Sequence, residues 1–216
     1  MPTVKTTLLM LITLIGHFLP EKYEPFEPIR YAENLTLDGY DIRSTHKMPD
    51  GSYVLIGQPD SFVSTNQGLR LFHLVEKNSR YVVNYVSAGV GESFMYRPTF
   101  YRKDGRTIIV CEMGTEYSWG ADAFLMENGE MQKLGTMDVA ACINHEEQQE
   151  SPIPILRIEE LEEEVIRFSF INSRYYAGMR VSGISLFLHP GHAKEEDIGV
   201  SSIHYEWDGS WRIRRN

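Results

Sequence analysis

Short apolar or alternating stretches, separated by turn residues, fill the chain from about residue 40 onward. Asp-Gly and Asn-Gly pairs recur between them and supply the positive φ angles that tight hairpin turns require. The pattern therefore predicts an all-β domain built from antiparallel hairpins. The expected pairs of strands are residues 41–48 with 52–56, 69–75 with 81–86, 99–102 with 106–111, 121–126 with 131–134, 155–158 with 165–171, and 203–207 with 211–214.

The faces of these stretches predict two kinds of strand. Residues 166–170 and 203–207 alternate apolar with polar side chains, which is typical of a strand with one wet face. Residues 53–56 and 107–111 are apolar on both faces, so we expect them to lie between packed layers. This mixture predicts hairpins packed as a two-layer sandwich or as an irregular propeller-like barrel, with little helix.

The start of the chain has the parts of an export signal. A single Lys5 precedes an apolar run at residues 8–15, and the run closes at Gly16 and Pro20. This run is shorter than the roughly 20 residues that a membrane span needs. It therefore predicts export, and a buried segment of a cytosolic protein is the alternative.

These features divide the chain into three parts. We expect an N-terminal export signal or short anchor at residues 1–19, a proline-rich linker at residues 20–30, and a single β domain at residues 31–216. The predicted location is the periplasm or cell envelope, with secretion as the alternative. Contact with a membrane is expected only through the N-terminal segment.

Composition narrows the class of partner. The 216 residues are 42% hydrophobic and 12% aromatic, which indicates a folded globule with a sizeable core. The net charge of −9 disfavours nucleic acid as a ligand, because that binding depends on basic patches. It favours a protein partner, a basic one in particular.

The two cysteines fall in the part of the chain that is predicted to be exported. A disulfide between Cys111 and Cys142 is chemically allowed there and would contribute about 3–4 kcal/mol. The alternative is a free core thiol, because Cys111 ends a strand-like stretch.

One loop carries metal-ligand chemistry. His189 and His192 flank a Pro-Gly turn, and carboxylates follow at residues 195–197. Imidazole and carboxylate are ligands for zinc or another divalent ion, and His145 or His204 is a candidate third ligand. A solvated polar loop is the simpler interpretation, so the expected cofactor is none, with a divalent metal as the alternative. Elsewhere the chain has no nucleophile elbow, redox Cys pair or phosphate-binding loop.

Aromatic side chains gather between residues 94 and 119. Loops that carry large aromatic rings indicate binding, because such rings are uncommon there. The alternative is that the rings plug the ends of the sheets as core residues. The predicted contact residues are Tyr96, Arg97, Tyr117 and Trp119.

An acidic run completes the candidate surface. Residues 141–200 hold eleven Asp or Glu against five Lys or Arg. Clustered carboxylates steer a basic partner toward contact, and a solvated surface is the alternative explanation. The run is expected in the loop of the 155–158 and 165–171 hairpin, and its members are Glu159, Glu160, Glu162, Glu163 and Glu164.

Together these features predict an exported, non-catalytic binding protein, such as an inhibitor or immunity-type protein that engages a protein partner through aromatic loops and an acidic patch. Two alternatives stay open. One is a metal-dependent hydrolase at the His189 and His192 loop, and the other is a carbohydrate-binding module that uses the same aromatic loops.

Overall fold

The predicted all-β class is confirmed. The computed structural model describes residues 20–31, 35–61, 67–91, 93–115, 118–137, 141–143, 149–161, 164–171, 175–178, 197–199 and 203–215; the side chains of residues 119, 141–143, 149–150, 175–178, 197–199 and 215 are not described. Within these ranges nearly every element is a strand. The helical element is one 3-10 turn, Ile153–Ile155.

Three antiparallel sheets of five strands make up most of the described fold. The first sheet has the order β3-β4-β5-β6-β7, with β3 (Ile29–Arg30), β4 (Tyr40–Lys47), β5 (Tyr53–Pro59), β6 (Arg70–Lys77) and β7 (Arg80–Val86). The central sheet has the order β11-β10-β9-β8-β2, with β2 (Glu24–Phe26), β8 (Met95–Lys103), β9 (Arg106–Gly114), β10 (Ser118–Glu127) and β11 (Glu130–Met137).

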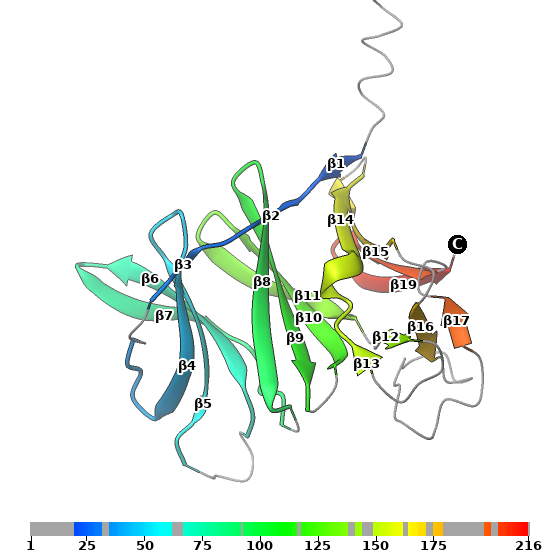
Figure 1. Ribbon diagram of the computed structural model, residues 1–216. Helices are drawn as coiled ribbons and strands as arrows, with labels where there is room; N and C mark the ends of the chain where they lie inside the picture. The colour runs from blue at the N-terminus through cyan, green and yellow to red at the C-terminus, as the bar shows by residue number, and fades with distance from the viewer. Residues whose placement is uncertain are drawn as a thin grey trace, which may run out of the picture.

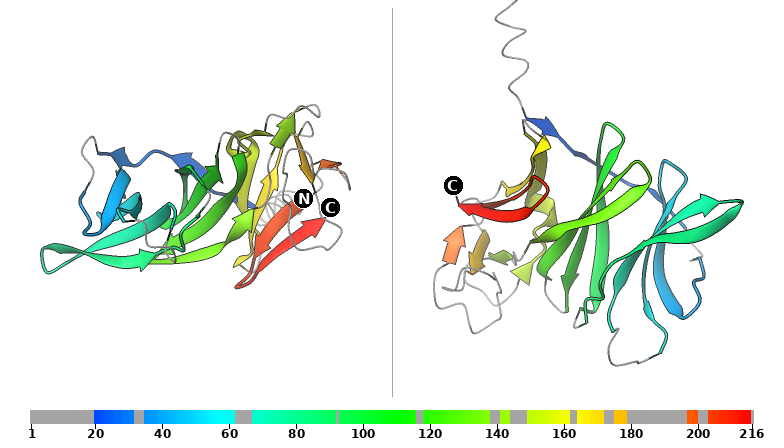
Figure 2. Two further views of the ribbon diagram at one scale, coloured as in Figure 1. Left: turned by 90° about the horizontal axis from the view of Figure 1, so that it is seen from below. Right: turned by 180° about the vertical axis from the view of Figure 1, so that it is seen from behind.

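The third sheet has the order β1-β14-β15-β18-β19, with β1 (Glu21–Lys22), β14 (Leu156–Glu160), β15 (Ile166–Phe170), β18 (Ile203–Trp207) and β19 (Trp211–Arg215). Figures 1 and 2 show the first, central and third sheets following one another across the molecule. A smaller sheet, β13-β12-β16-β17, combines β12 (Ala141–Ile143), β13 (Gln149–Glu150), β16 (Tyr175–Gly178) and β17 (Asp197–Gly199).

All six predicted hairpins are present as antiparallel pairs. Two of their Asp-Gly and Asn-Gly turns have both central residues in the predicted conformation. The central residues Asp104 and Gly105 have φ values of 47° and 81°, and the next hairpin places Asn128 and Gly129 at 53° and 77°. Both residues of each turn lie in the left-handed region, which matches the twist of the two flanking strands.

The central sheet buries side chains on both faces. From β9, Ile108 and Val110 enter a core cluster shared with the third sheet, whereas Ile109 and Cys111 enter a cluster shared with the first sheet. All four are 0% exposed. Each buried aliphatic side chain of this size stabilises the fold by roughly 1.5–3 kcal/mol. The prediction that residues 107–111 lie between layers is confirmed, and the sandwich has a third layer.

The first sheet is covered differently on its outer side. Tyr53 and Leu55 point away from the central sheet and join a small cluster with Phe72 and Leu74. Part of the chain just before and within β4 packs over this cluster, through Leu35, Leu37, Tyr40 and Ile42. Residues 53–56 are therefore buried on both faces, as predicted, with a loop and strand edge as the second cover.

The proline-rich segment at residues 20–30 pairs with all three large sheets. Its strands are β1, which pairs with β14, β2, which pairs with β8, and β3, which pairs with β4. Figure 1 shows this segment, in blue, crossing the sheets in turn. The sequence predicted an extended linker; the segment is extended, and it also belongs to the folded domain. Proline suits this edge position because an edge strand can leave N–H sites empty.

Trp211 of β19 packs directly against Gly135 of β11, and a substitution at Gly135 tests this contact. A Cβ atom at Gly135 would lie 2.2 Å from the Trp211 ring, whose Nε1 donates a hydrogen bond to the Thr136 carbonyl at 3.0 Å. We expect Gly135→Ala to lower the free energy of unfolding by about 1–3 kcal/mol, because the indole must shift. Urea unfolding measures this change.

The control is Gly91→Ala, where an added Cβ meets no atom within 4 Å. We expect that change to stay within about 0.5 kcal/mol of the wild type. Equal stability of the two variants would contradict the packing of Trp211 on β11.

Candidate functional site

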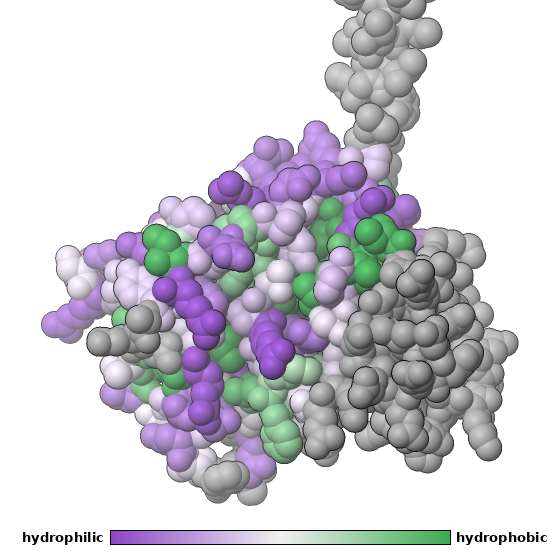
Figure 3. All heavy atoms as spheres, in the orientation of Figure 1, coloured by the Kyte–Doolittle hydropathy of each residue, from purple (hydrophilic) through white to green (hydrophobic). Residues whose placement is uncertain are grey.

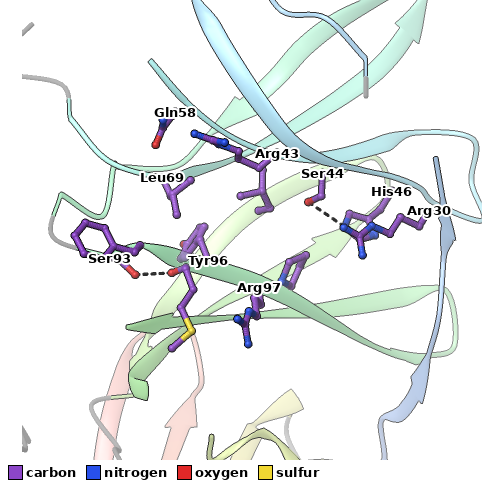
Figure 4. A pocket seen from close by; sticks show the side chains of 13 residues that line it. Arg30, Arg43, Ser44, His46, Gln58, Leu69, Ser93, Tyr96 and Arg97 are labelled. Carbon is purple, nitrogen blue, oxygen red and sulfur yellow. Dashed lines mark hydrogen bonds between the residues drawn. The ribbon is translucent and has the colours of Figure 1, made fainter. Parts of the chain in front are cut away.

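A hollow of about 660 Å³ lies between β4 of the first sheet and β8 of the central sheet. The first sheet contributes Ile56 and a set of polar side chains, Arg30, Arg43, Ser44, His46 and Gln58. Its other lining residues include the apolar Leu69, and Phe94, Tyr96 and Pro98 of the central sheet and its preceding loop. Figure 4 shows these side chains around the opening.

The short pairing of the proline-rich segment explains why an opening remains. Strand β2 pairs with residues 100–102 of β8, and β3 pairs with residues 46–47 of β4. The earlier part of β8 therefore has neither β2 nor β3 beside it. Pro98 lies in this stretch, and its missing N–H is compatible with an unpaired edge.

Two guanidinium groups border the hollow from the first sheet. Arg43 is half-exposed and forms an ion pair with Asp41 at 2.9 Å. Arg30 is exposed and forms no ion pair with any residue that the structure describes. Figure 4 places Arg43 near Gln58 and Arg30 near His46, at separate positions along β4. The hollow thus carries local positive charge on a chain whose net charge is −9.

Ser44 and His46 form the one close pair of potential catalytic groups in this hollow. The His46 Nε2 atom lies 3.2 Å from Ser44 Oγ. Burial, assisted by the nearby Arg30 charge, lowers the pKa of His46 to about 4. Among the described residues no carboxylate bonds to this ring, so the pair lacks the third group that orients a catalytic base. The arrangement is better suited to hydrogen bonding than to nucleophilic catalysis.

Phe94 is the most exposed large aromatic side chain among the described residues, at 83%. Its loop is held firmly. The Phe94 N–H donates to the Gly114 carbonyl at 2.9 Å. The neighbouring Ser93 hydroxyl accepts from the Gly114 N–H at 2.8 Å and lies within hydrogen-bond distance of the Met95 and Gly114 carbonyl oxygens. An exposed ring on a fixed loop keeps its apolar surface in water, which is typical of a binding contact.

Tyr96 has a different position from the one its proposed role requires. Alternation along β8 turns its ring into the core between the first and central sheets, where it is 4% exposed and forms the inner wall of the hollow. Arg97 is exposed and also lines the hollow, with its side chain directed away from that of Tyr96 (Figure 4). The contact roles of both residues stay predictions, and Tyr96 fits the alternative of a core ring.

A buried polar cluster fixes Tyr96 in place. Its hydroxyl donates to Asp122 Oδ2 at 2.8 Å, and the other carboxylate oxygen accepts from the Thr136 hydroxyl at 2.6 Å and pairs with Lys133 at 2.6 Å. Burial, together with the Asp122 charge, raises the pKa of Tyr96 well above its ordinary value. The carboxylate thus has donors on both oxygens, which makes its burial tolerable.

Two members of the acidic run, Glu159 and Glu160, lie beside basic side chains. Glu159 and Glu160 belong to strand β14, not to the predicted loop. Glu160 accepts from Lys103 at 3.0 Å, from Arg106 at 2.9 Å and from the Tyr23 hydroxyl at 3.2 Å. Although burial alone would raise it, these contacts hold the pKa of Glu160 below its usual value. Glu159 lies 3.9 Å from Arg157. Glu160 therefore joins the third sheet to the central one, Glu159 pairs within its own strand, and both are poorly placed to steer a partner.

Several predicted residues fall outside what the structure describes. Glu164 is described and exposed. Tyr117, Glu162, Glu163, His189 and His192 lie outside the described residues, as do residues 1–19 and the side chains of Trp119 and Cys142. Among the described side chains Cys111 has no sulfur partner, and the disulfide stays a prediction.

The described part of the chain contains no cluster of three or more His, Cys, Asp or Glu side chains suited to a metal ion. His204, a candidate third ligand, instead lies 3.3 Å from Glu206. No described segment forms a helix with the length and apolar composition needed to cross a membrane.

Comparison with protein-family models, with curated proteins and with solved structures finds no match for this chain. The functional interpretation therefore depends on the geometry of the site. The sequence places Phe94 in the aromatic stretch, but the predicted contact residues did not include it. They also did not include Arg30 and Arg43, because neither belongs to a recognisable motif.

The buried imidazole of His46 predicts a pH dependence of stability. Because its pKa falls from 6.5 to about 4 on folding, the unfolded chain binds the proton more tightly. This contribution to stability is complete above pH 6.5 and is lost as the pH falls toward 4. We expect the wild type to lose about 2–3 kcal/mol more than His46→Gln between pH 8 and pH 4.5.

Urea unfolding of both proteins across this pH range measures the difference. His73, which is fully buried, also has a lowered pKa because of desolvation, so His46→Gln should reduce the acid dependence without abolishing it. Identical pH profiles for the two proteins would show that His46 is not buried as described.

The Asp122 cluster predicts the cost of losing one donor. Tyr96→Phe removes the hydroxyl that bonds to Asp122, and we expect a loss of about 1–2 kcal/mol in the free energy of unfolding. The control is Tyr81→Phe, since the Tyr81 residue is 45% exposed and its hydroxyl meets that of Tyr53 at 3.5 Å. Thermal or urea unfolding compares them, and an equal effect at both positions would argue against the buried cluster.

Proposed function

We propose that this chain is an exported, non-catalytic binding protein of the inhibitor or immunity type, and that it holds a protein partner at the hollow between β4 and β8. The observation that carries the proposal is the exposure of Phe94, at 83%, on a loop fixed by backbone and Ser93 hydrogen bonds. Because the backbone that carries this ring is already held in place, less conformational entropy is lost when a partner covers it.

The surroundings of Phe94 support a protein contact. Aromatic and arginine side chains dominate the energetic centres of protein interfaces, and here an aromatic ring lies at a hollow that three arginines line, Arg30, Arg43 and Arg97. The face of the molecule shown in Figure 3 carries apolar groups that are separated by hydrophilic ones. This composition is compatible with a non-obligate interface, which is about as apolar as the rest of a protein surface. The export part of the proposal is supported by residues 1–20 of the sequence.

The experiment is a native pull-down with the tagged protein from the cells that produce it, followed by mass spectrometry. We expect the wild type to recover a stoichiometric partner and Phe94→Ser to recover at least about tenfold less, because a central aromatic anchor contributes on the order of 2 kcal/mol.

The matched control is Ile171→Ser, which removes an apolar side chain of 60% exposure from the end of the third sheet. This variant should recover as much partner as the wild type. Equal recovery by Phe94→Ser and wild type, or a wild-type preparation without any stoichiometric partner, would contradict the proposed function.

A further inference from the structure

The hollow between β4 and β8 has a charge pattern that specifies its occupant more closely. We infer that it takes an extended, acidic segment of the partner protein, with two carboxylates that pair with Arg30 and Arg43. This inference rests on the proposed function and adds the chemistry of the partner.

The guanidinium groups of Arg30 and Arg43 are accessible to a partner. Both residues are exposed at the hollow, and Arg30 has no ion-pair partner in the part of the chain that the structure describes. Among the described residues Arg43 forms an ion pair with Asp41 alone, and the Asp41 side chain is itself 47% exposed. The guanidinium fork is well matched to a carboxylate and holds its charge at every physiological pH.

Among the described residues that line the hollow, none carries a negative charge. Ser44, His46 and Gln58 line it, and each offers hydrogen-bonding groups without a negative charge. His46 is neutral at pH 7 because burial lowers its pKa to about 4. A carboxylate entering here meets donors and cations, although the chain as a whole is strongly acidic.

The separation of Arg30 and Arg43 matches an extended peptide. Arg30 lies on β3, directly opposite His46 of β4. Arg43 lies on β4, three residues before His46, so the Cα atoms of the two arginines are roughly 10 Å apart in the direction of the strand. A single carboxylate does not span this distance, whereas an extended peptide with acidic residues two to four positions apart does. Phe94 then offers an apolar contact beyond the charged pair.

The test is selection of a displayed library of random 12-residue peptides on the purified full-length protein. We expect selected peptides to be enriched in pairs of Asp or Glu two to four residues apart, next to an apolar residue. A chain of net charge −9 repels acidic peptides in general, so this enrichment would report a specific site.

Fluorescence anisotropy with the selected peptides then locates the site. The double variant Arg30→Gln/Arg43→Gln should weaken binding about tenfold or more, with a shallower salt dependence. The control Arg80→Gln/Arg157→Gln removes the same charge from exposed positions outside the hollow and should leave affinity within about twofold.

The outcomes separate this inference from the proposed function. Peptides without acidic enrichment, acidic peptides that bind the double variant as tightly as the wild type, or a selection that yields no peptide would each overturn the acidic-segment inference. If Phe94→Ser still abolishes partner capture in those cases, the binding function stands with a different ligand chemistry. If Phe94→Ser has no effect on capture, the proposed function fails as well.

Discussion

The rest of the structure depends on the burial of both faces of the central sheet. In β9 consecutive side chains enter different cores, with Ile108 and Val110 on the side of the third sheet and Ile109 on the side of the first sheet. Exposing either face to water would cost roughly 25 cal/mol of stabilising free energy for each Å² of apolar surface uncovered. Both outer sheets therefore pack against side chains of the same central strand, β9, and the three sheets form a three-layer unit.

The proline-rich segment at residues 20–30 links this packing to the site. It adds a short edge strand to each large sheet, and it covers only two or three residues of β14, β8 and β4. The remaining edges of β4 and β8 diverge beyond it, and the hollow opens there between the first and central sheets. The segment at residues 20–30, which pairs with all three large sheets, thus also determines where a partner can reach the edges of β4 and β8.

The hairpins were predictable because their determinants are local: alternation within a strand and a turn such as Asp104-Gly105 identify each one from about ten residues. The pairing of residues 20–30 was not, because β1 meets β14 across more than 130 residues and nothing in either stretch marks the other. The same holds for Glu160, whose partners Lys103 and Arg106 are distant in sequence. Tyr96 and Phe94 lie in one aromatic stretch, and the point where β8 begins decides which ring is buried.

The most direct test of the central claim is site-specific photo-crosslinking in the cells that produce the protein. A photoreactive phenylalanine analogue is placed at position 94, beside the hollow, or at position 171, at the end of the third sheet. A covalent adduct with one partner from position 94, and none from position 171, is the predicted result. Adducts of equal yield from both positions, or none from position 94, would contradict a binding site at this hollow.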